Sequence, residues 1–341
     1  MLRKKRKTLT IILLAAVLGI GVWGGLTVYN YKIRKAVVQD GGLYIPTGGT
    51  FDGMIDSLMA RGLISNEGRL RRFAAIRDLH DVRPGYYRLE KGMGYGELIN
   101  RLLSGAQTPV RVTFNNVRTV DRLAGSVARY LEADSASFAA ALTGDSLVRA
   151  LGFTPQTFIA MFIPNTYELY WTTTPEAFAG RMRKEYDRFW NKHREERRKE
   201  LGLTRTEVMT LASIVYEETK KNDEMARVAG VYINRLRQGM PLQADPTVKF
   251  AVGDVTLRRI LHKHLEVNSP YNTYKYAGLP PGPICMPSIR AIDAVLSPEA
   301  HDYLYFCARD DFSGYHNFAR TLAEHNRNAQ AYARALDSLR Q

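Results

Sequence analysis

The sequence of 341 residues is poor in cysteine and only moderately rich in glycine. Its two cysteines, Cys285 and Cys307, exclude a scaffold built on disulfides. Their spacing does not decide whether they pair, and we favour free, buried thiols. The 27 glycines are too few for a collagen-like chain, and an apolar content of 45% excludes wholesale disorder. The chain is therefore long and apolar enough for about two folded domains.

The chain also lacks the sequence motifs of several large enzyme classes. It has no G-x-S-x-G, no Walker A sequence, no HExxH and no Rossmann glycine fingerprint. Ser213 stands inside a predicted helix without a nearby base, which argues against a serine hydrolase. His262 and His264 form an HxH pair, but no third ligand has a suitable spacing. We expect these histidines to be structural or surface residues and predict no metal site.

Acidic residues are absent from the first 35 positions, which carry eight basic residues. The net charge of +14 thus divides into +8 there and +6 over the rest, so it does not by itself indicate nucleic-acid binding. Between these basic residues, 8–31 are uncharged and long enough to span a bilayer. Five bases precede this run and three follow it, which places the N-terminus in the cytoplasm. No A-x-A-like site follows, so we predict an uncleaved anchor over residues 1–35.

Residues 43–106 contain a weak internal repeat. A glycine followed by several apolar residues at helical spacing occurs twice, 44 positions apart. Each copy follows a stretch typical of a short strand, at 43–46 and at 86–89. We interpret 36–106 as a small module with two strand–turn–helix copies, although chance similarity between two amphipathic helices is the alternative. The matched residues are Gly48, Phe51, Met54, Ile55, Leu58 and Met59 with Gly92, Tyr95, Leu98, Ile99, Leu102 and Leu103.

Residues 107–341 contain no stretch typical of a flexible linker and are predicted to form one mixed α+β domain. The charged run 181–200 has nine bases and five acids, which fits a solvated helix face better than a nucleic-acid patch. Residues 241–287 are rich in loops. We expect strands at 110–114 and 303–308, the second one buried, and helices at 119–132, 135–143, from Thr174–Pro175 to Glu200, 206–221, 223–238 and 319–339.

One carboxylate of the helix 206–221 lies on its apolar face. At about 100° per residue, Glu218 falls within roughly 20° of Leu211, whereas Glu217 is rotated away and can be solvated. A desolvated carboxyl group has a raised pKa and can act as a general acid near neutral pH. The alternative is that the apolar stripe has ended and Glu218 points to water. The stripe consists of Val208, Leu211, Ala212 and Val215.

The loops after this helix supply further polar groups. We expect Gln243 and Asp245, with Thr247, to lie on a turn fixed by Pro246. A second loop supplies Tyr271, Asn272 and Tyr274 ahead of a rigid proline–glycine segment. Aromatic faces and amides on loops suit a sugar-binding cleft, although ordinary turn chemistry accounts for the same residues.

Four stretches, in this order, resemble the YceG-like family, the membrane-anchored endolytic murein transglycosylases of MltG type. They are LASIVYEET (211–219), RVAGVYINRLRQGMPLQADPTVKFAVG (227–253), YNTYKYAGLPPGPI (271–284), and YLYF (303–306) with HNFARTLAEHN (316–326). The resemblance covers nearly the whole chain. It implies an α+β fold with a single transmembrane helix (1–35), a LysM-like module (36–106) and a catalytic domain (107–341).

The resemblance also implies a function. Glu218 would be the general acid/base of a lyase that cleaves MurNAc-β-1,4-GlcNAc bonds in nascent glycan strands and leaves 1,6-anhydroMurNAc ends. Gln243, Asp245, Tyr271, Asn272 and Tyr274 are the candidate substrate-binding residues. No metal or organic cofactor and no nucleic acid is implied. The partners would be glycan strands, the bilayer and peptidoglycan synthases, with the catalytic domain outside the cytoplasmic membrane.

Three other functions stay open: a non-catalytic peptidoglycan-binding scaffold, a muramidase, and a binder of anionic polymers. The sequence also departs from the family pattern. Tyr216 replaces the first Glu of the E-x-E-T pattern, on the side of the helix away from Glu218. Ile159 and Ala160 stand where Glu-Gly is common, and Asn165 replaces an Asp, which puts a substrate role of that loop in doubt.

Overall fold

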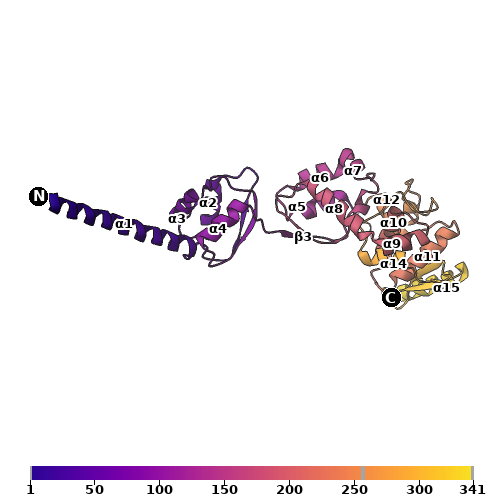
Figure 1. Cartoon of the computed structure of the whole chain (residues 1–341). Coiled ribbons are helices and arrows are strands. Elements are labelled where there is room, and N and C mark those ends of the chain that lie inside the picture. The colour runs from indigo at the N-terminus through magenta and orange to yellow at the C-terminus, as the bar shows by residue number, and fades with distance from the viewer. Residues whose placement is uncertain (1, 255–256, 258, 339–341) are drawn as a thin grey trace. The chain divides into compact units, whose positions relative to one another are not determined.

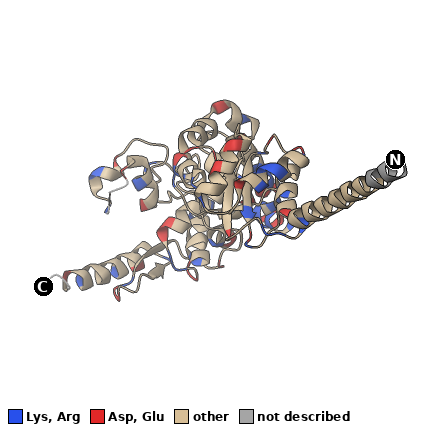
Figure 2. Cartoon of the chain, turned by 90° about the vertical axis from the view of Figure 1, so that its left-hand side faces the viewer, with Lys and Arg blue, Asp and Glu red and all other residues tan. Residues whose placement is uncertain are grey.

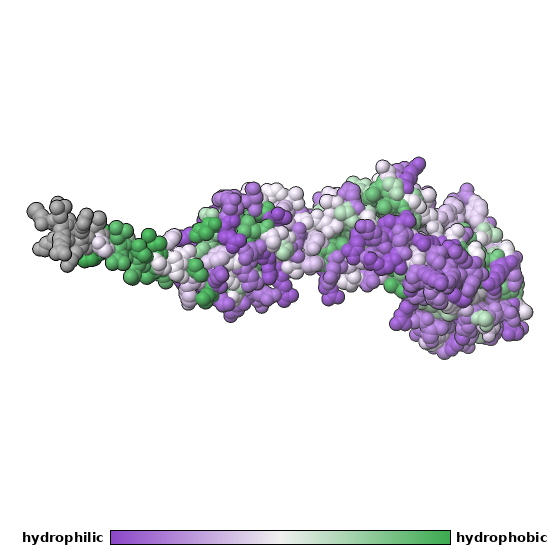
Figure 3. Space-filling view, viewed as in Figure 1, coloured by the Kyte–Doolittle hydropathy of each residue, from purple (hydrophilic) through white to green (hydrophobic). Residues whose placement is uncertain are grey.

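Helix α1 (Leu2–Lys32) contains the uncharged run of the sequence. In the computed structural model, which describes residues 2–254, 257 and 259–338, the segment Thr10–Lys32 is long and apolar enough to cross a bilayer, with a mean hydropathy of 2.3. Its large apolar side chains are exposed and form the green stretch in Figure 3. A helix surrounded by lipid has this composition, so the predicted anchor is confirmed as a candidate membrane span.

Packing divides the chain into two units, each of which has its own core. The first unit comprises Met1–Arg111, Tyr130–Glu132 and Glu168–Thr173, and the second comprises the remainder (Figure 1). Both units are largely helical with small two-stranded sheets. After α1, the first unit contains β1 (Gly41–Ile45), α2 (Phe51–Ala60), α3 (Glu67–Ile76), β2 (Gly85–Leu89) and α4 (Tyr95–Ser104).

The predicted repeat is a structural repeat. Strands β1 and β2 pair antiparallel, from Gly41 opposite Leu89 to Ile45 opposite Gly85, and each leads through a turn into a helix. Gly48 and Gly92 occupy equivalent turns with φ of +78° and +90°, a region that favours glycine. The matched apolar residues of α2 and α4 are buried in one core: Met54, Ile55 and Leu58 with Leu98, Ile99 and Leu102. Helix α3 has no counterpart in the repeat and was not predicted.

The second unit is built around a buried helix. Residues 208–215 of α10 (Arg205–Glu218) are buried on every face, because α11 (Met225–Arg237) and α14 (Ile289–Leu296) pack against it and against each other. The remaining helices are α5 (Val120–Ala128), α6 (Ser135–Thr143), α7 (Asp145–Ala150), the 3₁₀ helix η1 (Phe158–Met161), α8 (Pro175–Phe189), α9 (Lys192–Glu200), α12 (Asp245–Val252), α13 (His262–Leu265) and α15 (Leu322–Ser338). The strands of this unit are β5 (Tyr305–Ala308) and β6 (His316–Ala319), which pair antiparallel. Strand β3 (Val110–Phe114) lies beside β4 (Asn165–Leu169), and each of them has residues in both units.

Several predicted elements need correction. Helix α10 ends at Glu218, three residues early, because Thr219 adopts an extended conformation and its hydroxyl bonds to Glu224 and to the Lys221 amide. The predicted turn at Pro246 is the first turn of α12, where a proline needs no amide donor. Strand β5 begins at 305 and is half-buried, since α15 covers one side only. Helix α5 ends at Ala128, four residues early, and position 339 lies outside the described residues.

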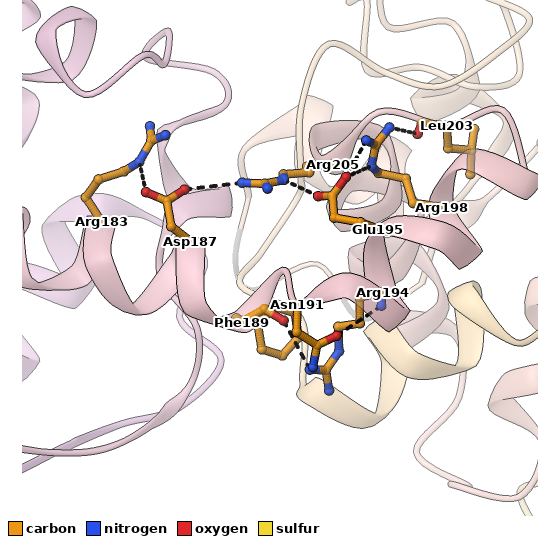
Figure 4. Close-up of polar contacts among 9 residues, drawn as sticks. All are labelled: Arg183, Asp187, Phe189, Asn191, Arg194, Glu195, Arg198, Leu203 and Arg205. Atoms are coloured by element: carbon orange, nitrogen blue, oxygen red, sulfur yellow. Dashed lines mark hydrogen bonds and ion pairs between the residues drawn. The ribbon is translucent and has the colours of Figure 1, made fainter.

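The cysteines and the charged run agree with the favoured interpretations. Cys285 and Cys307 are both free, the first buried and the second half-buried. Two acids of the charged run, Asp187 and Glu195, are bridged by Arg205 of α10 at 3.2 and 2.5 Å, which ties α8, α9 and α10 together (Figure 4). Basic and acidic residues are interspersed along the ribbon (Figure 2). This is an ion-paired helix surface and not a basic patch.

Candidate active site

A cavity of about 440 Å³ in the second unit lies at the C-terminal end of α10. Its walls come from α11, the start of α12, the hairpin β5–β6 and α15, which are far apart in the sequence. Apolar and aromatic groups such as Leu242 and Phe306 line one part of the wall. The polar groups that face it include Glu218, Tyr232, Arg235, Gln243, Asp245 and Tyr274.

Glu218 is the last residue of α10 and lines this cavity. Burial raises the pKa of its carboxyl group to about 7, and the charges of Asp245 and Glu217 act in the same direction. A hydrogen bond from Tyr232 Oη to Glu218 Oε1, 2.6 Å long, and the charge of Arg235 oppose this rise in pKa. The negative end of the helix dipole also disfavours a carboxylate at this position. The group is therefore substantially protonated near neutral pH.

Tyr232 holds the carboxyl group of Glu218 in place. The side chain is 2% exposed, and its ring packs edge-to-face on Phe306 with centroids 5.8 Å apart. Burial and the neighbouring Glu218 raise the pKa of the phenol well above its usual value, so it stays a donor. Tyr232 was not among the site residues predicted from the sequence. Its place on the apolar face of α11, four residues after Val228, could have signalled it, because a buried phenol needs a partner.

Arg235, one turn further along α11, is a buried cation. It donates to the backbone carbonyls of Leu304, Pro241 and Leu242 at 2.6, 3.1 and 3.0 Å, and to Gln243 Oε1 at 3.2 Å. Its guanidinium lies 5.1 Å from the centre of the Tyr305 ring. In the described part of the chain it forms no ion pair with a carboxylate, and burial lowers its pKa. Arg235 thus joins the loop before α12 to strand β5 across the cavity.

The predicted substrate-binding residues fall into two groups. Gln243, Asp245 and Tyr274 line the cavity with Glu218, and Tyr274 Oη donates to Asp245 Oδ1 at 2.6 Å. Asn272 is buried and does not line it, because its amide donates to the carbonyls of Leu265 and Val267 while its Oδ1 accepts from the Tyr274 amide. Tyr271 packs against Phe250, with ring centroids 4.6 Å apart. These two residues therefore shape the loop that presents Tyr274.

The two adjacent glutamates have opposite environments. Glu217 is ion-paired with Arg118 at 2.7 Å and with Lys220 at 3.4 Å, and its side chain is only 16% exposed. It is thus paired and not freely solvated. Tyr216, which replaces the first Glu of the family pattern, stacks under the Lys220 ammonium group. Neither residue lines the cavity, which leaves Glu218 as the acid of this helix that faces it.

Further residues of the wall come from the C-terminal segment and were not predicted. His316 bonds through Nδ1 and its backbone amide to the buried carboxylate of Glu224, both at 2.9 Å, which fixes the β5–β6 hairpin to the start of α11. His325 stacks on Tyr305, with ring centroids 5.6 Å apart. Among the described residues, no group of His, Cys, Asp and Glu is arranged to hold a metal ion. This includes His262 and His264, which lie in the short helix α13.

With this geometry established, comparison with known proteins identifies the family. The model of the YceG-like family matches residues 43–331, which is most of the chain. The chain belongs to the YceG-like family. The family match covers both units, including the repeat of the first unit and every residue of the cavity wall.

Relatives are similar over nearly the whole sequence. A Bacillus subtilis protein named endolytic murein transglycosylase is 29% identical, over 91% of this chain and 90% of its own length. A Streptococcus pneumoniae protein of the same name is 27% identical over 89% of this chain, which spans 62% of that longer protein. A crystal structure of a yceG-like protein from Listeria monocytogenes is 27% identical and superposes with a TM-score of 0.55, covering 85% of this chain and 98% of that one.

Proposed function

We propose that this protein is an endolytic lytic transglycosylase of peptidoglycan with Glu218 as its general acid/base. The observation that carries the proposal is a partly buried carboxyl group, with a pKa near 7, in a cavity large enough for sugar rings. The names of the relatives supply the substrate class and the type of reaction. The N-terminal anchor would hold the two units on the outer face of the cytoplasmic membrane, with the first unit acting as a LysM-like module.

Glu218 acts twice in this mechanism. Because Oε1 accepts the hydrogen bond from Tyr232, Oε2 carries the acid proton. That proton passes to the glycosidic oxygen as the bond to C1 of MurNAc breaks, and the GlcNAc leaves with a free 4-hydroxyl. The carboxylate then takes the proton of the MurNAc 6-hydroxyl while O6 bonds to C1. The carboxylic acid is regenerated, a 1,6-anhydro ring is formed, and no water is consumed.

A muramidase is the second candidate, because Asp245 gives the cavity another carboxyl group. Retaining and inverting glycosidases use two carboxylates, one on each side of the scissile bond. The hydrogen bond from Tyr274 stabilises the Asp245 carboxylate and fixes its position, which suits either a nucleophile or a sugar-orienting group. We favour the second role, since Asp245 is exposed and begins a helix, where a carboxylate is stabilised by the dipole.

The two reactions differ in what they do with water. Purified full-length protein in detergent, incubated with glycan strands in H₂¹⁸O, should release 1,6-anhydro ends that contain no ¹⁸O. A muramidase would release reducing ends with one ¹⁸O each, and a binding scaffold would release no fragments. Mass spectrometry of the products separates the three outcomes, and only the first supports the lyase.

Replacing Tyr232 by phenylalanine should move the pH profile. The hydrogen bond from Tyr232 favours the ionised form of Glu218, so its loss raises the pKa of the acid further. Because the reaction needs protonated Glu218, kcat/KM of the wild type should fall as the pH rises through about 7. In the variant this alkaline limb should shift upward by roughly half to one pH unit, corresponding to one hydrogen bond. An unmoved or downward-shifted limb, measured from initial rates between pH 5 and 9, would contradict the assignment.

A further inference from the structure

A second cavity adjoins the candidate active site. Its volume is about 470 Å³, and Asp245 and Tyr274 line both cavities, so the hydrogen-bonded pair of side chains forms a shared wall. The other side of the second cavity is made by residues around α13, including Arg259, Leu261 and Lys263. All of these residues belong to the second unit. The two cavities are therefore adjacent, with the side chains of Asp245 and Tyr274 between them.

The second cavity is lined by two cations, Arg259 and Lys263, and by the carboxylate of Asp245 in the shared wall. Arg259 and Lys263 are exposed, and neither forms an ion pair or hydrogen bond with any residue that the structure describes. By contrast, Arg183, Arg198 and Arg205 are paired with carboxylates, as Figure 4 shows. The cavity also contains exposed apolar surface, since Leu261 is 48% exposed. These features suit an anionic group carried on a partly apolar chain.

The proposed reaction supplies such a group. If Glu218 protonates the bond between MurNAc and GlcNAc, the MurNAc ring occupies the first cavity, and its 3-O-lactyl substituent must leave that cavity. In peptidoglycan this substituent bears a carboxylate, either the bare lactyl group or the carboxylates of an attached stem peptide. We propose that the second cavity is a subsite for the carboxylate of the muramyl substituent, bound by Arg259 and Lys263. This proposal rests on the proposed function.

Binding to the Glu218→Gln protein tests the subsite without relying on catalysis. In that background, the change Arg259→Gln/Lys263→Gln should weaken binding of peptide-bearing glycan oligosaccharides about 5- to 20-fold, as expected for the loss of two solvent-accessible charge pairs. The charge-conserving change Arg259→Lys/Lys263→Arg should restore most of the affinity. Lys184→Gln, which removes an exposed cation that lines neither cavity, is the control and should leave the affinity unchanged.

Three ligands, measured by calorimetry on the full-length protein, identify the group that is bound. A loss confined to peptide-bearing strands indicates a peptide carboxylate. A loss confined to denuded strands indicates the lactyl carboxylate, which is an amide in peptide-bearing strands. A loss on both kinds of strand indicates that the subsite accepts either carboxylate. Chitin oligosaccharides have neither a lactyl group nor a peptide. They should bind equally to the Glu218→Gln protein with and without the change Arg259→Gln/Lys263→Gln. An equal loss on all three ligands, or no loss on any, would overturn the subsite. The lyase proposal is judged separately, from the products of the enzyme with Glu218 intact.

Discussion

Replacing Glu218 by glutamine is expected to lower the rate of glycan cleavage about 10³-fold, with little change in folding. The substitution keeps the size of the side chain and an oxygen that can accept the hydrogen bond from Tyr232. It removes the one proton that the mechanism needs twice, and loss of a general acid/base typically costs about 10²- to 10⁴-fold. Turnover of purified glycan strands by full-length protein in detergent gives the measurement.

The adjacent residue provides a matched control. Glu217→Gln removes a carboxylate of the same size from the same helix, but from a side chain paired with Arg118 and Lys220 outside the cavity. Its activity should stay within about threefold of the wild type, since exposed or partly exposed ion pairs contribute little. If the two variants lose activity equally, the chemistry depends on the helix end as a whole and not on the Glu218 carboxyl group.

Replacing Arg235 by alanine is expected to destabilise the second unit by about 3 kcal/mol or more. The change leaves the carbonyls of Leu304, Pro241 and Leu242 without their buried donor, and each unsatisfied group costs about 1–3 kcal/mol. It also frees Gln243 from the guanidinium, so the loop before α12 loses its tie to β5. Glycan cleavage should fall together with stability.

Thermal unfolding followed by circular dichroism measures this effect. Two units need not unfold together, so the transition assigned to the second unit is the one to compare. Arg235→Lys keeps a charge but has one nitrogen in place of a branched group, and it should recover only part of the lost stability. A midpoint of the Arg235→Ala protein within 2–3 °C of the wild type would show that this bridge is not a major support of the site.

Local sequence patterns correctly predicted those features that depend on residues close together in the chain. The uncharged run predicted α1, and the two glycines at an offset of 44 predicted two equivalent turns, since both need a positive φ. The apolar period of α10 placed Glu218 toward the interior and Glu217 away from it. In each case, the feature is determined by residues within one or two turns of each other.

The wall of the candidate site could not be predicted in this way. Tyr232 and Arg235 matter because their partners, Glu218 and Leu304, reach them through tertiary packing. The half-buried strand β5 and its partner β6 enclose the cavity only because α15 packs on them. Asp245 was expected on a turn, but the proline after it begins a helix instead. Asn272 was expected to contact a sugar, but its side-chain amide donates a hydrogen bond to the nearby Leu265 carbonyl instead. The spacing of apolar residues along the sequence does not predict contacts between residues that are far apart in the chain.

The release of 1,6-anhydroMurNAc ends by wild-type and Glu218→Gln proteins, digested side by side and quantified by mass spectrometry, tests the central claim most directly. We expect anhydro ends from the wild type, falling as the pH rises above about 7, and about 10³-fold fewer from the variant. Anhydro ends released at the wild-type rate by the Glu218→Gln protein would contradict the claim that the Glu218 carboxyl group performs the chemistry.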